Sequence, residues 1–333
     1  MKLNPITLAL LLFVGDAKLT FAANSKTNDV VVFIAKGNEA FLRKDFKIAI
    51  DCFSRVLKLD PNNADACYRR GWSQQFMEKY DDAIEDFNKT ILICSNNYFL
   101  SMAYLGRGNA YFEKNKYEQA IGNYSKAIQI NSGLVEAYAG RAQAYSLTKR
   151  YDSAVIDFTT AILLNPTNDV LYSSRAGLFC IKTNYLRAMA DFDNAIEINP
   201  QSSDAYASRG YFFFTIGRYA DSVADCTKSI KLNTNSAQAY NNLAWVLTVA
   251  PDAEVRDGKK GLEFAKRACE LSLWKNAYCL GTLAAAYAET GNFEEAIKWE
   301  KRCIAIGLPE KDRRHAREEL ELFKQGKPYR LEK

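Results

Sequence analysis

The sequence is poor in the residues and motifs on which most catalytic sites depend. It has one histidine, His315, in 333 residues, and His315 lies in a polar stretch at 311–324 that is typical of a solvated helix. No Gly-x-Ser-x-Gly, Walker, His-Glu-x-x-His or Gly-x-Gly-x-x-Gly motif occurs. The eight cysteines include no Cys-x-x-Cys pair, which argues against a redox or zinc site. We therefore predict a protein that is not an enzyme and that holds no cofactor or metal.

Long apolar runs and long basic runs are also missing. The apolar stretch near the N-terminus, Ile6–Val14, is far shorter than the ~20 residues that a membrane-spanning helix needs, and no other segment could be transmembrane. The formal net charge is +5, with Lys, Arg, Asp and Glu interspersed and no basic run interleaved with aromatic residues. We therefore expect no nucleic-acid binding, and no membrane insertion apart from the N-terminal segment.

The N-terminus is typical of a secretory signal peptide. Lys2 precedes the apolar stretch, and small residues that suit cleavage follow it, with possible cuts after Ala17 or Ala22. We predict a signal peptide over 1–22, a linker over 23–29, and a periplasmic or secreted protein. The alternative is an uncleaved N-terminal segment that anchors the protein.

Small residues recur at a nearly constant spacing through the rest of the chain. Their separations are 34, 37, 34, 34, 34, 34 and 40 residues. The series is Gly37, Gly71, Gly108, Ala142, Ala176, Gly210, Ala244 and Ala284. A period near 34 residues is typical of stacked helical hairpins, in which small residues let the backbones approach closely.

Aromatic residues and prolines mark the two helices of each 34-residue unit, when the small residue above is counted as position 8. Position 24 holds Phe53, Phe87, Tyr124, Phe158 and Phe192. Position 17, where the second helix should begin, holds Phe46, Tyr80, Tyr117, Tyr151, Tyr185, Tyr219 and Phe293. Prolines at position 32 should end that helix, and polar residues after them suit the start of the next one: Pro61, Pro166, Pro200, then Asn63, Asn168 and Ser202.

This pattern resembles the tetratricopeptide repeat, and the fourth unit shows it well with Tyr138, Ala142, Tyr145, Ala154, Phe158, Ala161 and Pro166. The repeats lie at 30–63, 64–97, 101–134, 135–168, 169–202, 203–236, 237–276 and 277–310. The resemblance implies an all-α, right-handed superhelical solenoid of about eight helix-turn-helix hairpins over 30–310. A capping helix and tail over 311–333 would follow it.

Two polar positions change together between repeats. Repeats 2 to 6 carry Arg at position 7 and Asp or Asn at position 23, whereas repeats 1, 7 and 8 lack both. The pairs are Arg70 with Asp86, Arg107 with Asn123, Arg141 with Asp157, Arg175 with Asp191, and Arg209 with Asp225. We predict that the two positions touch across each hairpin and that the four Arg–Asp pairs are structural ion pairs. The alternative is a basic stripe for an anionic ligand.

The resemblance also implies a binding groove, because positions 2, 5, 9 and 12 of the first helices face the concave side in such proteins. Here those positions include Tyr68, Trp72, Asn109, Phe112, Gln143, Tyr211, Phe214, Asn241 and Trp245. Rings edged by amide side chains suit an extended peptide or a helix. We expect Trp72, Tyr211 and Trp245 to be the anchors; the alternative is that both tryptophans pack against neighbouring repeats or the N-terminal segment.

The seventh repeat departs from the pattern by five inserted residues, which we place within 251–260. The stretch from Asn241 to Glu300, with GKPYR near the end of the chain, is similar to a C-terminal tetratricopeptide module found in many bacterial proteins. We expect Asp257 to cap the helix after the insertion; the alternative is an Arg256-Asp257-Gly258 binding loop.

The cysteines follow the repeat positions. Cys67, Cys226 and Cys303 occupy core positions and are expected to be buried, while Cys269, Cys279 and Cys303 cluster closely enough for one disulfide whose pairing the sequence does not select.

Taken together, these patterns predict a non-catalytic scaffold that binds a protein or peptide segment in its concave groove. The alternative is an envelope-assembly or oligomeric component that binds through its outer surface. The partner, the pathway and the oligomeric state are not determined by the sequence.

Overall fold

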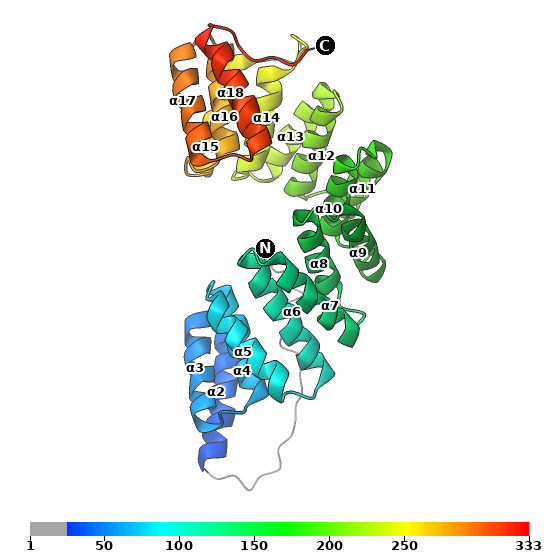
Figure 1. The fold of residues 1–333 in the computed structure, drawn as a ribbon, viewed down its shortest axis with the longest axis vertical. Helices are drawn as coiled ribbons and strands as arrows, with labels where there is room; N and C mark the ends of the chain where they lie inside the picture. The colour runs from blue at the N-terminus through cyan, green and yellow to red at the C-terminus, as the bar shows by residue number, and fades with distance from the viewer. Residues whose placement is uncertain (1–24, 333) are drawn as a thin grey trace. The chain divides into compact units, whose positions relative to one another are not determined.

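The computed structural model describes residues 25–332, and every regular element in that range is a helix (Figure 1). The first helices of successive hairpins are α2 (Ser25–Leu42), α4 (Ala64–Phe76), α6 (Asn97–Glu113), α8 (Val135–Leu147), α10 (Asp169–Ile181), α12 (Ser203–Thr215), α14 (Ala237–Val249) and α16 (Ala277–Glu289). The second helices are α3 (Phe46–Leu59), α5 (Tyr80–Ile93), α7 (Tyr117–Ile130), α9 (Tyr151–Leu164), α11 (Tyr185–Ile198), α13 (Tyr219–Leu232), α15 (Gly258–Leu271) and α17 (Phe293–Ile306). Helix α18 (Glu310–Lys324) comes last. The predicted all-α solenoid of hairpins with a capping helix is confirmed for the described residues.

The helix ends follow the side chains that mark them. In seven hairpins the second helix begins at the predicted aromatic residue. Asn63 caps α4 by accepting a hydrogen bond from the Ala66 backbone N–H at 2.9 Å, and Asn168 and Ser202 cap α10 and α12 in the same way. Helices α3, α9 and α11 end within two residues of a proline, as proline geometry requires.

Small residues bring the two helices of each hairpin together. A Cβ atom added at Gly71 would lie 3.0 Å from the Phe87 ring, and one added at Gly108 would lie 2.8 Å from the Tyr124 ring. Both rings are almost completely buried. Position 8 is therefore small because the ring at position 24 fills the space that a side chain there would need.

The chain divides into two compact units at the link between α9 and α10. The N-terminal unit ends at Pro166, and its described part holds α2 to α9; the C-terminal unit begins at Thr167 and holds α10 to α18. Within each unit the two helices of a hairpin pack against each other, and the second helix packs against the first helix of the next hairpin.

The predicted contacts between positions 7 and 23 are present in all five hairpins. Arg141 donates from Nε and Nη2 to the two carboxylate oxygens of Asp157, at 2.7 and 2.8 Å. Three other arginines bind their aspartates in the same bidentate way, and Arg107 donates to Asn123 Oδ1 at 2.7 Å. Arg141 Nη1 also reaches Ser125 of the preceding hairpin at 3.0 Å. The arginines thus join neighbouring hairpins, a role that the prediction did not include.

Three boundary predictions can be compared with the structure. Helix α2 begins at Ser25, inside the predicted linker 23–29, so the linker is wrong over 25–29. No proline or glycine lies between Ser25 and Lys36 to stop the helix from extending.

The insertion in the seventh repeat forms a loop that ends at Asp257, and Asp257 Oδ1 caps α15 by accepting from the Lys260 backbone N–H at 3.1 Å, as predicted. The predicted signal peptide over 1–22 lies outside the described residues.

All eight cysteines are thiols, and Cys67, Cys226 and Cys303 are buried as predicted. Cys269 Sγ approaches the carbonyl oxygen of Cys279 at 3.3 Å rather than another sulfur. In the described part of the chain no helix combines the length and the apolar composition that crossing a bilayer requires.

Candidate functional site

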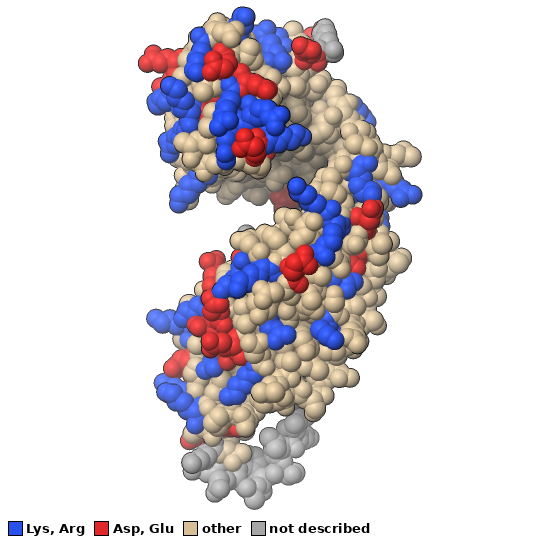
Figure 2. Space-filling view, in the orientation of Figure 1, with Lys and Arg blue, Asp and Glu red and all other residues tan. Residues whose placement is uncertain are grey.

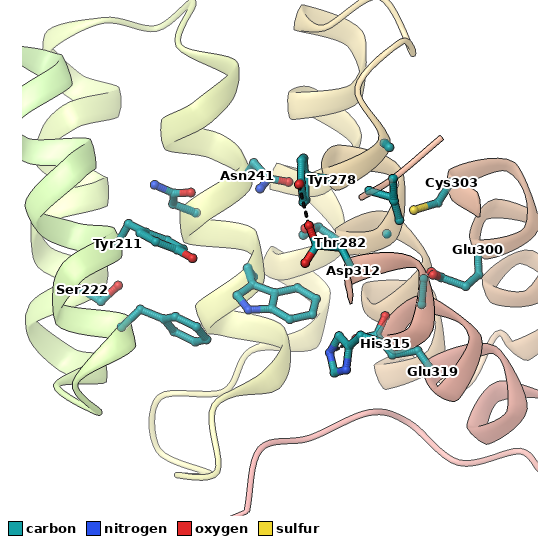
Figure 3. Close-up of a pocket in the computed structure, with 17 residues that line it drawn as sticks. Tyr211, Ser222, Asn241, Tyr278, Thr282, Glu300, Cys303, Asp312, His315 and Glu319 are labelled. Carbon is teal, nitrogen blue, oxygen red and sulfur yellow. Dashed lines mark hydrogen bonds and ion pairs between the residues drawn. The ribbon is translucent and has the colours of Figure 1, made fainter. Parts of the chain in front are cut away.

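A pocket of about 280 Å³ lies in the C-terminal unit (Figure 3). Helices α12, α14 and α16 supply one group of its side chains, and α17 and α18 supply most of the others. Ser222 of α13 and Leu308, between α17 and α18, complete the lining. Four predicted groove residues line it: Tyr211, Phe214, Asn241 and Trp245. Two of these residues lie on α12 and two on α14, so the first helices of two successive hairpins bring together residues that are up to 34 positions apart in the sequence, as the repeat implies.

The aromatic side chains of the pocket differ in how far they are exposed to solvent. Tyr211 is 55% exposed, and its ring stacks on Phe214 with the centroids 6.4 Å apart. Trp245 is half-buried and stacks on Tyr329 of the C-terminal tail at 6.0 Å. The edge of His315 meets the same Tyr329 ring at 5.1 Å. Tyr211 is thus available to a partner, whereas the tail fixes the orientation of Trp245.

Ion pairs hold that tail in place. Arg330 donates two hydrogen bonds to the carboxylate of Glu289, each 2.9 Å long, and Arg256 donates a third at 3.1 Å. The Leu331 backbone N–H donates to the Val249 carbonyl oxygen at 2.9 Å. The inserted loop, the end of α16 and the GKPYR segment therefore form one structure beside the pocket. Arg256 is part of this ion-pair cluster, which supports the structural interpretation of the Arg256-Asp257-Gly258 loop.

Two buried glutamates lie at the inner end of the pocket. Glu300, on α17, is 0% exposed, and neither of its carboxylate oxygens has a hydrogen-bond partner among the described residues. Glu319, on α18, is also buried and faces His315, with Nε2 and Oε1 3.1 Å apart. Burial, and then the charge of Glu319, raises the pKa of Glu300 above its ordinary value. Burial likewise raises the pKa of Glu319, although His315 opposes this.

His315 and Tyr278 are each bound to an acidic residue of α18. The hydrogen bond to Glu319 raises the pKa of His315, which favours the imidazolium form. Tyr278 Oη donates to Asp312 Oδ2 at 2.8 Å and ties α16 to α18 (Figure 3). That bond raises the pKa of Tyr278 to about 12. The expectation that His315 is simply a solvated surface residue is incomplete, because its half-exposed ring lines the pocket and pairs with a buried carboxylate.

The pocket also contains Cys303, which does not have the properties of a nucleophile. Burial raises the pKa of Cys303 to about 12, so the thiol keeps its proton at neutral pH. Among residues 25–332, no group of three or more His, Cys, Asp or Glu side chains is arranged to hold a metal ion.

Tyr68 and Trp72 are not available to a partner, and their assignment to the groove is wrong. Each is 1% exposed. The Trp72 ring meets Phe87 edge-on at 5.6 Å and lies 6.3 Å from Phe76, and Tyr68 meets Phe99 at 5.3 Å. Large neighbouring rings close over both side chains, so the N-terminal unit uses them as core.

The other predicted groove residues lie in the N-terminal unit and line no part of the pocket. Asn109 accepts a hydrogen bond from the Tyr124 hydroxyl at 2.8 Å, so it has a structural role. Phe112 packs edge-on against Tyr117 at 5.5 Å, and Gln143 is half-buried on α8.

Glu300 and Glu319 are the residues of the site that the prediction missed. Glu300 occupies position 24 of the eighth repeat, where the first five repeats have a buried ring. A charged residue at a core position of a repeat was the signal available in the sequence. Glu319 follows no repeat, and nothing in the sequence pairs it with Glu300.

Charge on the molecular surface is mixed, as the composition predicts. On the face shown in Figure 2, basic and acidic side chains lie intermingled over the helices. The acidic character of the pocket is therefore a local property of α17 and α18.

Comparison with known proteins places the repeats in a family. Models of the tetratricopeptide repeat match residues 64–97, 135–168 and 276–307, and a TPR repeat model matches 108–148. The chain is similar to "DnaJ homolog subfamily C member 7" of Homo sapiens, with 34% identity over 97 residues, 28% of this chain and 19% of that protein. It is also similar to "Small glutamine-rich tetratricopeptide repeat-containing protein 2" of Saccharomyces cerevisiae, with 30% identity over 28% of this chain and 27% of that protein.

Solved structures agree on the fold. The crystal structure of yeast Tom70 matches with a TM-score of 0.62 and 16% identity, covering 96% of this chain and 69% of that one. At such identity the likeness concerns the fold alone. The chain spans about a fifth to a quarter of the length of the curated relatives described above.

Proposed function

We propose that the chain is a non-catalytic scaffold that binds a protein or peptide segment in the pocket of its C-terminal unit. The proposal builds on its tetratricopeptide repeats, because proteins of this kind generally mediate protein–protein interactions. One observation carries the proposal: four of the predicted groove residues converge on one pocket, where Tyr211 is 55% exposed. An exposed, orientable ring beside amide groups offers contact area and backbone hydrogen bonds to an extended segment.

The chemistry of the pocket supports binding rather than catalysis. Cys303 is a protonated thiol and His315 is engaged by Glu319, so the two do not form a nucleophile and its base. Glu300 is completely buried at the inner end of the pocket, where it favours the protonated form. A general acid must contact the atom that it protonates. Because Glu300 is completely buried, it could protonate only a group that enters the inner end of the pocket.

We propose further that the protein is of a bacterial type and is exported, with residues 1–22 as a signal peptide and the periplasm or the outside as its location. The apolar stretch Ile6–Val14 and the small residues before Asn24 support this proposal. Mass spectrometry of the N-terminus, on protein recovered from separate cell fractions, tests it. A mature chain that starts after Ala17 or Ala22 is expected; an intact Met1 in the cytoplasmic fraction would refute export.

The binding proposal is tested by capture of partners from an extract of the source cells. The full chain and a Tyr211→Ala variant serve as baits, and equal unfolding midpoints show that the variant is folded. Loss of an exposed anchoring ring is expected to lower capture of the specific partner about tenfold or more. Equal capture by both baits would show that the pocket does not bind it.

A second candidate function is assembly through the outer surface, in the cell envelope or in an oligomer. Exposed leucines favour it: Leu92 is 84%, Leu163 77% and Leu186 85% exposed. Single exposed apolar side chains are common on protein surfaces, and they mark an interaction surface where they form a contiguous patch. A Leu186→Ser variant in the same capture experiment distinguishes the two, because it removes an outer apolar side chain and leaves the pocket intact. Loss of the partner with Leu186→Ser, and not with Tyr211→Ala, would support assembly.

A further inference from the structure

The last hairpin contains a carboxylate where the repeat favours a ring. At position 24 the first five repeats bury Phe53, Phe87, Tyr124, Phe158 and Phe192, each at most 2% exposed. Glu300 takes this position in the eighth repeat and is equally buried. An apolar residue there would stabilise the hairpin by burial, whereas a buried carboxylate without a hydrogen bond destabilises it. A residue that breaks a local rule in this way marks a candidate functional site.

The surroundings of Glu300 include several buried hydrogen-bond acceptors that have no partner among the described residues. Both of its oxygens lack partners, and so does the buried Oδ1 of Asn241 in the same pocket. Glu319 adds a second carboxylate, whose facing cation, His315, is half exposed. The other titratable side chains of the pocket are Asp312 and Tyr278, which bind each other, Tyr211, and the neutral thiol of Cys303. Within residues 25–332, no lysine or arginine lines the pocket.

The pocket has apolar walls and ends beside these buried acceptors. Trp245, Phe214 and Leu308 line it, and Gly281 lies beside Glu300, such that a Cβ atom added there would be 3.9 Å from Glu300 Oε2. Because this residue is glycine, no side chain of its own packs on that side of the carboxylate, which is nonetheless 0% exposed. The volume of about 280 Å³ is slightly below the roughly 300–1,000 Å³ of pockets for drug-sized ligands, which fits a single long side chain.

We propose that this pocket receives a lysine or arginine side chain of the partner polypeptide, and that Glu300 releases its proton to solvent and becomes the counter-ion when this cation binds. The apolar walls would hold the methylene stem, the Trp245 ring would face it, and the acceptors at the inner end would bind the charged head. The inference rests on the proposed function in one respect, that the cation belongs to a polypeptide. It adds the chemical identity of the residue that the scaffold recognises.

Three short peptides test the proposal on the full chain: acetyl-Gly-Gly-X-Gly-Gly-amide, in which X is lysine, arginine or the uncharged norleucine. Binding is followed by the indole N–H signals in NMR spectra of the 15N-labelled protein. The four tryptophans include Trp245 in the pocket and Trp72, buried in the N-terminal unit, as an internal reference. A Trp245→Phe variant assigns the pocket signal.

Three variants connect the binding to Glu300. Glu300→Gln keeps the shape and removes the charge, and Glu294→Gln makes the same charge change at an exposed position of the same helix. Gly281→Ala adds a methyl group next to Glu300 Oε2 and leaves both carboxylates; it fits sterically, because its nearest neighbour, Cys303 Sγ, would be 3.4 Å away. It therefore keeps the test valid if Glu300→Gln alters folding.

The lysine or arginine peptide is expected to shift the Trp245 signal and not the Trp72 signal, with the norleucine peptide at least about tenfold weaker. Glu300→Gln and Gly281→Ala should weaken binding about tenfold, and Glu294→Gln should not. The better of the two basic peptides identifies the head group. Equal binding of norleucine, or undiminished binding of lysine and arginine by Glu300→Gln, would overturn the inference while leaving a peptide-binding pocket. If none of the peptides shifts the Trp245 signal, the inference also fails, and the Tyr211→Ala capture experiment still decides the proposed function separately.

Discussion

Arg141 and Asp157 form a bidentate ion pair that closes the fourth hairpin, with N–O distances of 2.7 and 2.8 Å and Asp157 almost fully buried. Arg141→Leu leaves the aspartate buried without its partner, so we expect the free energy of unfolding to fall by about 3–5 kcal/mol. The double variant Arg141→Leu/Asp157→Phe removes both charges and should recover much of that loss. Urea denaturation of both variants measures this.

The matched control is Arg43→Leu, which breaks the ion pair between Arg43 and Glu39. The Arg43 side chain is 75% exposed and the Glu39 side chain is 60% exposed. Its effect should stay within about 1 kcal/mol, because water and mobile side chains weaken surface pairs. Additive losses for the two substitutions of the buried pair would contradict the coupling that the geometry indicates.

A second prediction separates the buried tryptophan from the exposed tyrosine. Trp72→Ala removes a ring packed against Phe87 and Phe76, and we expect it to destabilise the N-terminal unit by about 3–5 kcal/mol. Tyr211→Ala removes a ring that is 55% exposed and should change stability by less than about 1 kcal/mol. Thermal unfolding of both variants provides the measurement. Equal, small shifts would mean that Trp72 is solvent-accessible after all.

The fold could be predicted because its determinants are local and repeat. Tyr117 begins α7 and Tyr151 begins α9 because the ring and the small residues of each unit recur at fixed spacing. The Arg141–Asp157 contact could also be predicted, since the two positions change together across repeats. The start of α2 at Ser25 could not be predicted, because the repeat pattern locates each hairpin but does not determine how far its first helix extends toward the N-terminus.

The site could be predicted only in part, for a physical reason. Position 9 of a repeat faces the groove on average, but the sizes of the neighbours decide whether a ring there stays accessible. Trp72 is enclosed by Phe76 and Phe87, whereas Trp245 remains beside a pocket. Glu319 comes from a helix outside the repeats, so its proximity to Glu300 is a property of tertiary packing that no spacing contains.

A third prediction concerns the C-terminal tail. Glu289→Ala removes the carboxylate that Arg330 and Arg256 share, and leaves two cations close together. We expect the tail to detach, with Tyr329 leaving Trp245. Hydrogen exchange of the Leu331 amide, which donates to Val249, should then increase at least about tenfold. Glu254→Ala, an exposed change in the nearby loop, serves as the control. Unchanged protection of Leu331 in Glu289→Ala would show that the backbone bond alone holds the tail.

The last prediction concerns how stability depends on pH. Burial raises the pKa of Glu300, so the folded state binds its proton more tightly than the unfolded state, in which the ordinary value of 4.5 applies. Between that value and the raised pKa the folded state carries more protons, and the free energy of unfolding must fall as pH rises. His315 acts in the same direction, because its raised pKa stabilises the fold at low pH and that stabilisation is lost as pH rises through it.

We therefore expect the C-terminal unit to unfold at a lower urea concentration at pH 9 than at pH 6. The free energy of unfolding should fall by about 1.4 kcal/mol for each pH unit over which Glu300 is protonated in the folded state and ionised in the unfolded state. Glu300→Gln cannot ionise and should flatten this dependence, leaving the smaller contributions of His315 and Glu319. Glu294→Gln removes an exposed carboxylate from the same helix and should leave the slope unchanged. A slope in Glu300→Gln equal to that of the parent would mean that Glu300 does not gain a proton on folding and that burial does not raise its pKa.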